Sequence, residues 1–143
     1  MYNILLTDDE QIVIDSLSFI INENFEGQVN TYTALSGTQA LEVVTNNKID
    51  IIFMDINMPG INGLETISCI TKLKPDTVII MLSAFDKFQY AQEAMNIGAF
   101  KYLTKPFNKN TIIQTIRSAM DLIDSKKDTK ITSQELNKKI DLV

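Results

Sequence analysis

Two patterns of apolar and polar positions alternate along this chain. Short apolar runs rich in β-branched residues favour strands, most of them buried on both faces. The strand candidates are residues 2–6, 28–33, 51–54, 77–82 and 99–103. Between them, apolar residues recur at helical spacing. The helix candidates begin near Glu10, Ser36, Asn62, Asp86 and Asn108. The pattern therefore predicts five strand–helix units.

The predicted helices carry local end signals. Ser36 and Gln39 have the spacing of a capping box, as do Asn62 and Glu65. Gly98 is placed to end the fourth helix. Short buried strands in strict alternation with amphipathic helices imply an α/β fold, with a parallel sheet and helices on both of its faces.

The last twenty positions depart from this pattern. Residues 124–130 are charged and break the helical periodicity, so we interpret them as a linker or a solvated helix end. Thr132 and Glu135 repeat the capping-box spacing, and apolar residues follow at helical spacing. We therefore expect one domain over residues 1–123. Residues 124–143 would form a charged linker or helical extension that leads toward an output domain outside this chain.

Composition limits the number of domains and the cellular compartment that we expect. The 143 residues, 45% of them hydrophobic, suit one domain with a real core. No run approaches the ~20 apolar residues that span a bilayer, and the N-terminus lacks a signal-peptide pattern. The single cysteine, Cys69, excludes an internal disulfide and fits a reducing compartment. We expect Cys69 to be packing material in a cytoplasmic protein that does not contact membranes.

The charge and the missing histidine exclude several functions. The net charge is −5 and the isoelectric point is near 4.6, which argues against direct binding of DNA phosphates and suits a cation site. The chain contains no histidine, which removes Ser-His-Asp and Cys-His catalysis and, with one cysteine, ordinary zinc sites. Any phosphohistidine chemistry would need a histidine from another protein.

Polar residues follow the predicted strands at the ends where the strands stop. Asp8 and Asp9 close the first strand, Asp55 the third, Ser83 the fourth and Lys105 the fifth. In a parallel sheet these ends lie at one edge, where ligands bind. Clustered carboxylates repel one another, and a magnesium ion held by oxygen ligands relieves that repulsion. The lysine and the serine hydroxyl can receive an anion, and Asp55 is a plausible nucleophile that forms an acyl phosphate.

Each of these residues also has an ordinary structural interpretation. Asp55 could cap a turn, and one of the acids from Asp8 to Glu10 could serve a helix N-terminus. Ser83 could start a helix, and Lys105 could be a surface lysine. A shared binding site is favoured because all of these residues are expected at the same ends of their strands.

Together these residues resemble the receiver domain of two-component response regulators. The resemblance covers about residues 3–123. It rests on motifs that occur in order, namely Asp8-Asp9, DINMPGINGLE from Asp55, Ser83-Ala84 and GAFKYLTKPF from Gly98. The resemblance implies a flavodoxin-like, doubly wound sheet of five parallel strands in the order 2-1-3-4-5.

The resemblance also implies roles in binding and chemistry. Asp55 matches the phosphoacceptor. Asp8 and Asp9 match the acidic pair that holds Mg²⁺, with Asp9 the more direct ligand. Asp55 itself and the backbone carbonyl of Asn57 would complete the protein ligands. Lys105 matches the lysine that pairs with the phosphoryl group.

Three further matches concern the switch. Ser83 matches the hydroxyl that turns toward the phosphoryl group, and Tyr102 the aromatic residue that moves inward with it. Tyr102 could equally be half-buried core. Pro106 matches the proline that follows the lysine through a cis bond.

By this resemblance the chain is a phosphorylation-controlled signalling switch. A partner histidine kinase would donate the phosphoryl group, and the chain would catalyse only its own phosphorylation and slow hydrolysis. The sequence from Ser83 to Pro106 is most similar to that of receivers joined to AraC-type DNA-binding domains, which suggests transcriptional regulation. We expect output, including homodimer formation, on the face of the fourth helix, fifth strand and fifth helix, roughly residues 86–120.

Three alternatives remain. A stand-alone receiver would act on a protein target. A magnesium-dependent phosphatase with an aspartyl-phosphate intermediate usually has a second acid two residues after its nucleophile, where this chain has Asn57. A flavodoxin would need a Ser/Thr/Gly-rich loop after the first strand, and the acidic sequence TDDE from Thr7 would repel its phosphate.

Overall fold

The computed structural model describes residues 1–84 and 88–141 and contains all five predicted strand–helix units. The strands are β1 (Tyr2–Thr7), β2 (Val29–Ala34), β3 (Ile51–Asp55), β4 (Val78–Ser83) and β5 (Lys101–Thr104). The helices are α1 (Gln11–Asn24), α2 (Gly37–Asn46), α3 (Gly63–Leu73), α4 (Phe88–Asn96) and α5 (Lys109–Asp141). The predicted cap at Asp86 lies outside the described residues.

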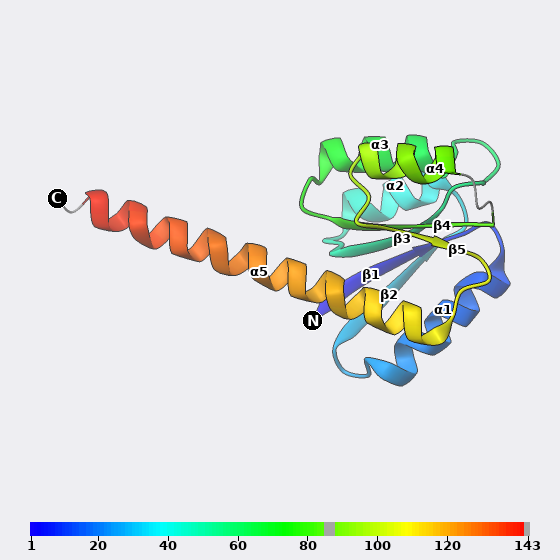
Figure 1. The fold of residues 1–143 in the computed structure, drawn as a ribbon, viewed down its shortest axis with the longest axis horizontal. Coiled ribbons are helices and arrows are strands. Elements are labelled where there is room, and N and C mark those ends of the chain that lie inside the picture. Colours follow the sequence, from blue (N-terminus) through cyan, green and yellow to red (C-terminus); the bar gives the residue numbers. More distant parts are fainter. Residues whose placement is uncertain (85–87, 142–143) are drawn as a thin grey trace.

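The strands form one parallel sheet in the order β2-β1-β3-β4-β5, which confirms the expected topology. Helices α2, α3 and α4 cover one face of this sheet, and α1 and α5 cover the other (Figure 1). Each face has its own core of buried side chains. The chain is therefore a doubly wound α/β domain.

The central strands show how the sequence builds two cores at once. All residues of β3 and β4 are buried. Successive side chains point to opposite faces, so Phe53 and Ile80 join the core under α1 and α5. Met54 and Met81 join the core under α2, α3 and α4. Burial on both sides explains why these strands read as continuous apolar runs.

Side-chain caps fix two of the helix starts as predicted. Ser36 Oγ accepts a hydrogen bond from the backbone N–H of Gln39 at 3.1 Å, and Asn62 Oδ1 accepts one from Glu65 at 2.9 Å. Gln39 departs from the usual capping box, because its Oε1 accepts the N–H of Leu35 at 2.7 Å. Gly98 follows α4 with φ of +102°, a conformation that favours glycine.

The buried face of α1 is centred on Ile14, Leu17 and Ile21, with Val13 half-buried against the same core. One expectation about packing needs correction. Cys69 is exposed, because its position on α3 faces away from the residues that pack on the sheet. Apolar spacing located α3 and its buried residues Ile67 and Ile70, but it did not show that Cys69 lies on the exposed face.

Helix α5 continues without interruption to Asp141 and extends beyond the sheet (Figure 1). The spacing of Thr132 and Glu135 therefore does not start a separate helix. Residues 109–141 contain neither glycine nor proline, so the charges that break the apolar stripe do not break the backbone. The domain boundary at residue 123 remains a prediction. Among the described residues, no helix combines the length and apolar character needed to cross a bilayer.

Candidate functional site

The parallel register aligns the ends of four strands at one edge of the sheet. Thr7 pairs with Met54 across β1 and β3, and Asp55 pairs with Leu82 across β3 and β4. The last residue of β4, Ser83, pairs with Thr104 on β5. The residues that follow β1 and β5 therefore emerge beside the ends of β3 and β4.

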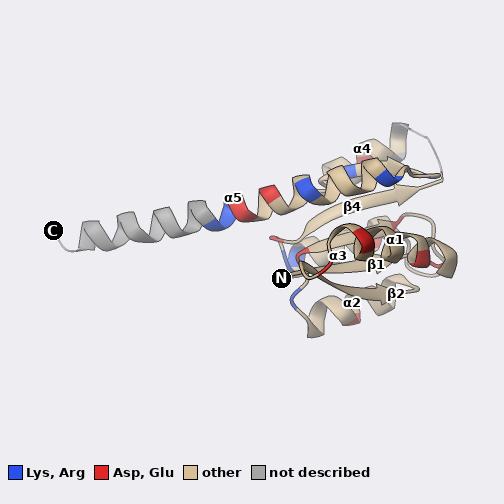
Figure 2. Cartoon of the chain, turned by 90° about the horizontal axis from the view of Figure 1, so that it is seen from below, with Lys and Arg blue, Asp and Glu red and all other residues tan. Residues whose placement is uncertain are grey.

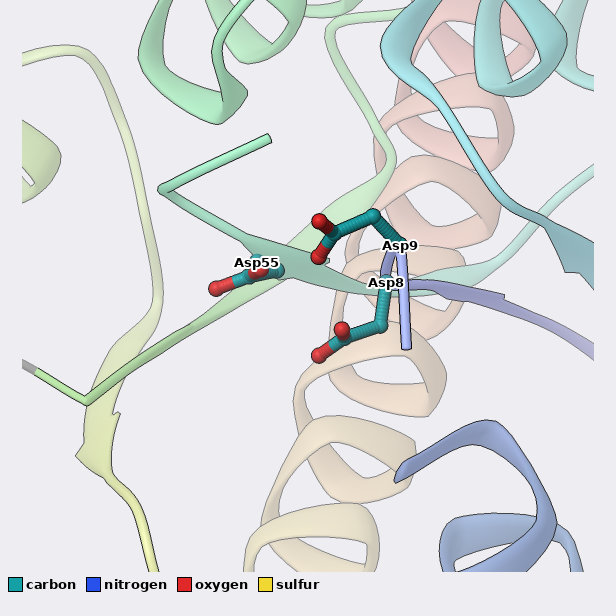
Figure 3. A group of neighbouring side chains, drawn as sticks. All are labelled: Asp8, Asp9 and Asp55. Carbon is teal, nitrogen blue, oxygen red and sulfur yellow. The ribbon is translucent and has the colours of Figure 1, made fainter. Parts of the chain in front are cut away.

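Three carboxylates converge at this edge. One carboxylate oxygen from each of Asp8, Asp9 and Asp55 lies within 4.8 Å of the others. The three side chains are directed into the same space (Figure 3). Asp8 and Asp55 are 0% and 4% exposed, whereas Asp9 is exposed. Two buried acids in one pocket are costly unless something compensates their charge.

Lys105 provides part of that compensation. Its Nζ lies 2.7 Å from Asp8 Oδ2 and 3.5 Å from Asp55 Oδ1. The backbone N–H of Lys105 donates to the carbonyl oxygen of Ser83 at 2.8 Å, and the bond to Pro106 is cis. The second oxygen of Asp8 accepts the N–H of Glu10 at 2.9 Å. Asp8 is thus hydrogen-bonded through both oxygens, whereas the lysine is farther from Asp55.

Burial and neighbouring charges shift the pKa values of both Asp55 and Lys105. Burial, followed by the negative charge of Asp8, raises the pKa of Asp55 from 3.8 to about 6, although Lys105 opposes this. Burial alone would lower the pKa of Lys105. The hydrogen bond to Asp8 and the charges of Asp55 and Asp8 outweigh that effect and raise it. The lysine therefore remains charged, whereas burial and the neighbouring acids disfavour the ionised form of Asp55.

The donor set suits a hard divalent cation. Three carboxylates and one lysine leave two uncompensated negative charges when all are ionised. A divalent ion would balance them. All three side-chain donors are oxygens, which magnesium prefers, and magnesium sites often use few protein ligands. The residues present therefore fit the predicted metal.

The other predicted site residues lie around this cluster. Ser83 is buried at the end of β4, and Tyr102 is half-buried on β5, opposite Met81. Tyr102 packs against the core under α2, α3 and α4, on the opposite face of the sheet from the core that contains Phe53. Asn57 is exposed in the loop that follows β3.

An apolar groove beside Lys105 was missed by the sequence analysis. It has a volume of about 490 Å³ and lies between α1 and the segment that follows β5. Its lining residues are Ile12, Val13, Ser16, Ala84, Lys105, Pro106 and Phe107. Ile12 is 71% exposed. The available signal was that Ile12 is apolar yet falls outside the buried stripe of α1.

Comparison with known proteins places this geometry in a family. The family model of the response regulator receiver domain matches residues 4–117. The uncharacterized transcriptional regulatory protein YesN of Bacillus subtilis is 39% identical over 116 residues, covering 81% of this chain and 32% of that protein. Sporulation initiation phosphotransferase F of Bacillus subtilis is 27% identical over 120 residues, covering 83% of this chain and 94% of that protein.

Solved structures agree with these similarities. A CheY-like receiver domain from Methanospirillum hungatei superposes with a TM-score of 0.82 at 25% identity, covering 88% of this chain and 98% of that one. A receiver domain from Clostridium thermocellum has a TM-score of 0.78 at 30% identity, covering 89% and 98%. The chain spans 32% of YesN and 46% of the sensory transduction protein LytT of Bacillus anthracis. With its fold, its acidic edge and the match over residues 4–117, the chain belongs to the response regulator receiver domain family.

Proposed function

We propose that Asp55 accepts a phosphoryl group from the phosphohistidine of a partner histidine kinase and that the chain acts as a signalling switch. One observation carries the proposal. Asp55 is a nearly buried carboxylate whose pKa is raised to about 6 by burial and by its acidic neighbours, beside a charged lysine. A carboxylate that is poorly compensated before reaction is suited to bonding with an electrophilic phosphorus atom.

The residues of the site divide the chemistry among themselves. At pH 7 most Asp55 side chains are ionised, so a carboxylate oxygen can form the new O–P bond while the P–N bond of the donor breaks. The electron pair of that bond leaves with the donor imidazole. Lys105 Nζ, 3.5 Å from Asp55, would pair with the added negative charge.

Asp9, Asp8, Asp55 and the backbone carbonyl of Asn57 would hold magnesium. When bound, the ion would neutralise phosphoryl oxygens during transfer. Asp9 is the more direct candidate ligand, because it is exposed while both oxygens of Asp8 are hydrogen-bonded. The chain would thereby support its own phosphorylation and slow hydrolysis, with no separate substrate.

The apolar groove supplies a surface on which the donor protein could dock. It includes Lys105 itself, so a helical segment seated there would bring a histidine toward Asp55. Its exposed apolar residues favour a protein partner, because such side chains gain by leaving water. The donor histidine must come from that partner, since this chain has none.

Phosphorylation would be read on the face formed by α4, β5 and α5. A dianionic phosphoryl group would gain a hydrogen bond if Ser83 turned toward it, and Tyr102 could then rotate into the space behind the serine. Both side chains lie on the side of the sheet that α4 covers. Repacking there would change the surface of α4 and promote homodimer formation or binding of a partner.

The output is proposed to be transcriptional, through an AraC-type DNA-binding domain. Similarity to the transcriptional regulatory protein YesN supports a transcriptional output, and the sequence from Ser83 to Pro106 is the reason to propose an AraC-type domain. The receiver itself is not expected to bind nucleic acid. Positive and negative residues are interspersed along the described part of α5 rather than gathered in a basic stripe (Figure 2). A stand-alone receiver acting on a protein target is the second candidate, since sporulation initiation phosphotransferase F matches over nearly its whole length.

Acetyl phosphate with Mg²⁺ provides the direct test. Intact-mass spectrometry should detect one added phosphoryl group that is labile in base, as acyl phosphates are. Asp55→Asn, or chelation of the metal, should abolish the adduct. Asp50→Asn, an acid at the opposite edge of the sheet, is the matched control and should label normally. A base-stable adduct on serine or threonine would disprove the aspartyl mechanism.

Ser83→Ala separates the switch from the chemistry. It should leave labelling of Asp55 largely intact and remove self-association induced by beryllofluoride and Mg²⁺, measured by light scattering. Hydrogen exchange in both states should locate the change on α4, β5 and α5. Changes confined to α1 and α2 would rule out this output face.

A further inference from the structure

Gly63, the first residue of α3, lies against the backbone of the strand that carries Asp55. A Cβ at this position would overlap the carbonyl oxygen of Asp55 and would lie 2.8 Å from the Cα of Ile56. The N–H of Gly63 also donates to the carbonyl oxygen of Ile56 at 2.8 Å. The first turn of α3 therefore packs directly on the end of β3, and this contact leaves no room for a side chain.

The reason for glycine here is space and not backbone conformation. The glycines with positive φ are Gly27, Gly60 and Gly98, and Gly63 is not among them. The atoms that a side chain would meet belong to the backbone, so no rotamer change can make room. A methyl group would have to separate α3 from β3 or displace the intervening loop, residues 56–62.

Both elements that flank the loop are held in place. The end of β3 is tied to β4, because the N–H of Ile56 donates to Leu82 at 3.0 Å. Helix α3 packs closely on the start of α2, where a Cβ at Gly37 would overlap Thr66 Oγ1. Ile67 and Ile70 also anchor α3 in the core. Within the loop Ile56 and Met58 are buried, so its exposed positions, which include Asn57, are the part most able to yield.

We propose that Gly63 is a positioning residue for the metal and phosphoryl site. By allowing α3 to contact the end of β3, it fixes the Asp55–Ile56 peptide and the loop. It thereby sets where the Asp55 carboxylate and the Asn57 carbonyl lie relative to Asp8 and Asp9. This inference rests on the proposed function, since it assigns the loop to magnesium binding.

The test compares Gly63→Ala with Gly37→Ala by calorimetric titration with Mg²⁺. All titrations are made in trimethylamine N-oxide, which favours the folded state, with folding checked by circular dichroism. Gly63→Ala should weaken Mg²⁺ binding at least tenfold and slow labelling by acetyl phosphate at saturating Mg²⁺. Gly37→Ala also introduces a methyl group into a tight contact, but its nearest neighbour is the side-chain Oγ1 of Thr66, and the nearest backbone atom, the carbonyl oxygen of Ile61, is 3.0 Å away. It should lower the melting temperature while leaving Mg²⁺ affinity within about twofold.

Three results would overturn the proposal. The first is a folded Gly63→Ala protein with Mg²⁺ affinity and labelling rate within twofold of the parent. The second is equal weakening of Mg²⁺ binding in both variants, because general loosening would then explain the loss. The third is failure of Gly63→Ala to fold even in the osmolyte. If the parent itself shows neither Mg²⁺ binding nor labelling, the proposed function fails instead.

Discussion

Carboxylates lie beside hydrogen-bond donors at both edges of the sheet, but the two edges differ in how deeply the acids are buried and how closely they crowd together. At the carboxyl edge, Asp8 and Asp55 are buried with one lysine between them. At the amino edge, Asp124 on α5 accepts the hydroxyl of Tyr2 through both oxygens, at 2.7 and 2.8 Å. Asp50 accepts the N–H of Asn3 at 2.8 Å.

Burial and crowding account for the difference. Asp50 and Asp124 each accept a hydrogen bond from their own donor, and both have access to water, which solvates their charge. Asp8 and Asp55 are buried and share one cation, and burial together with the charge of Asp8 raises the pKa of Asp55 to about 6. Carboxylates are therefore not enough to mark a site. Acids that are close, buried and short of positive charge are what give this edge an affinity for cations.

Removing the shared cation should give the largest effect. Lys105→Met would leave two buried acids without their lysine, and we expect a loss of about 3 kcal/mol in the free energy of unfolding without metal. Urea denaturation in EDTA measures this loss. Lys101→Met on the same strand is the control and should cost under about 1 kcal/mol, since Lys101 is exposed and lies 5.6 Å from the Phe100 ring centroid. Equal losses would mean that the lysine does not compensate the acids.

Neutralising Asp55 should stabilise the metal-free protein. Its folded pKa, about 6, exceeds the ordinary 3.8, so the folded state binds this proton more tightly than the unfolded state. That contribution is fully present below pH 3.8 and is lost as pH rises through 6. At pH 8, Asp55→Asn should therefore gain about 2–3 kcal/mol in the free energy of unfolding, and the gain should vanish near pH 4. A gain independent of pH would disprove the charge argument.

Asp50→Asn sharpens the comparison between the two edges. Because Asp50 accepts the N–H of Asn3, its neutralisation should destabilise the protein slightly at pH 8, by about 0.5–1 kcal/mol. The same substitution would thus have opposite signs at the two edges. Urea denaturation of both variants at pH 8 is sufficient, and a gain in both would mean that total negative charge is what matters.

Magnesium should relieve the repulsion among the carboxylates at the carboxyl edge and should not affect the amino edge. At ten times its dissociation constant, a ligand of the folded state adds about 1.4 kcal/mol, so the melting temperature should rise in millimolar Mg²⁺ and fall back in EDTA. Asp9→Ala should reduce this response, because Asp9 is the exposed acid of the cluster. An unchanged melting temperature in the parent protein would contradict the metal site.

The smallest effect should come from the amino edge. Tyr2→Phe removes a hydrogen bond to Asp124, and we expect a loss of about 0.5 kcal/mol because the pair is exposed to water. The same bond raises the pKa of Tyr2 to about 12. Spectrophotometric titration of the tyrosines should therefore include one that ionises late and is absent from Tyr2→Phe. A loss as large as that of Lys105→Met would remove the distinction between the edges.

The sequence by itself determined the alternation of strands and helices, and it located the acids, the serine and the lysine at strand ends. It could do so because backbone periodicity and end signals such as Ser36 and Asn62 are local. The family resemblance then supplied the strand order and assigned the residues their roles. It did not settle whether residues 124–141 form a linker or a helix, because charge spacing does not fix the backbone.

Only the tertiary structure decided which groups are crowded and which are exposed. The pairing of Lys105 with Asp8 in preference to Asp55 depends on how residues 97 positions apart are brought together. The exposed apolar groove at Ile12 and the contact of Gly63 with Asp55 likewise depend on neighbours from distant segments or on the path of a loop. Burial and distance govern the charges and contacts of this site. Both are set by packing, which a pattern along one chain does not contain.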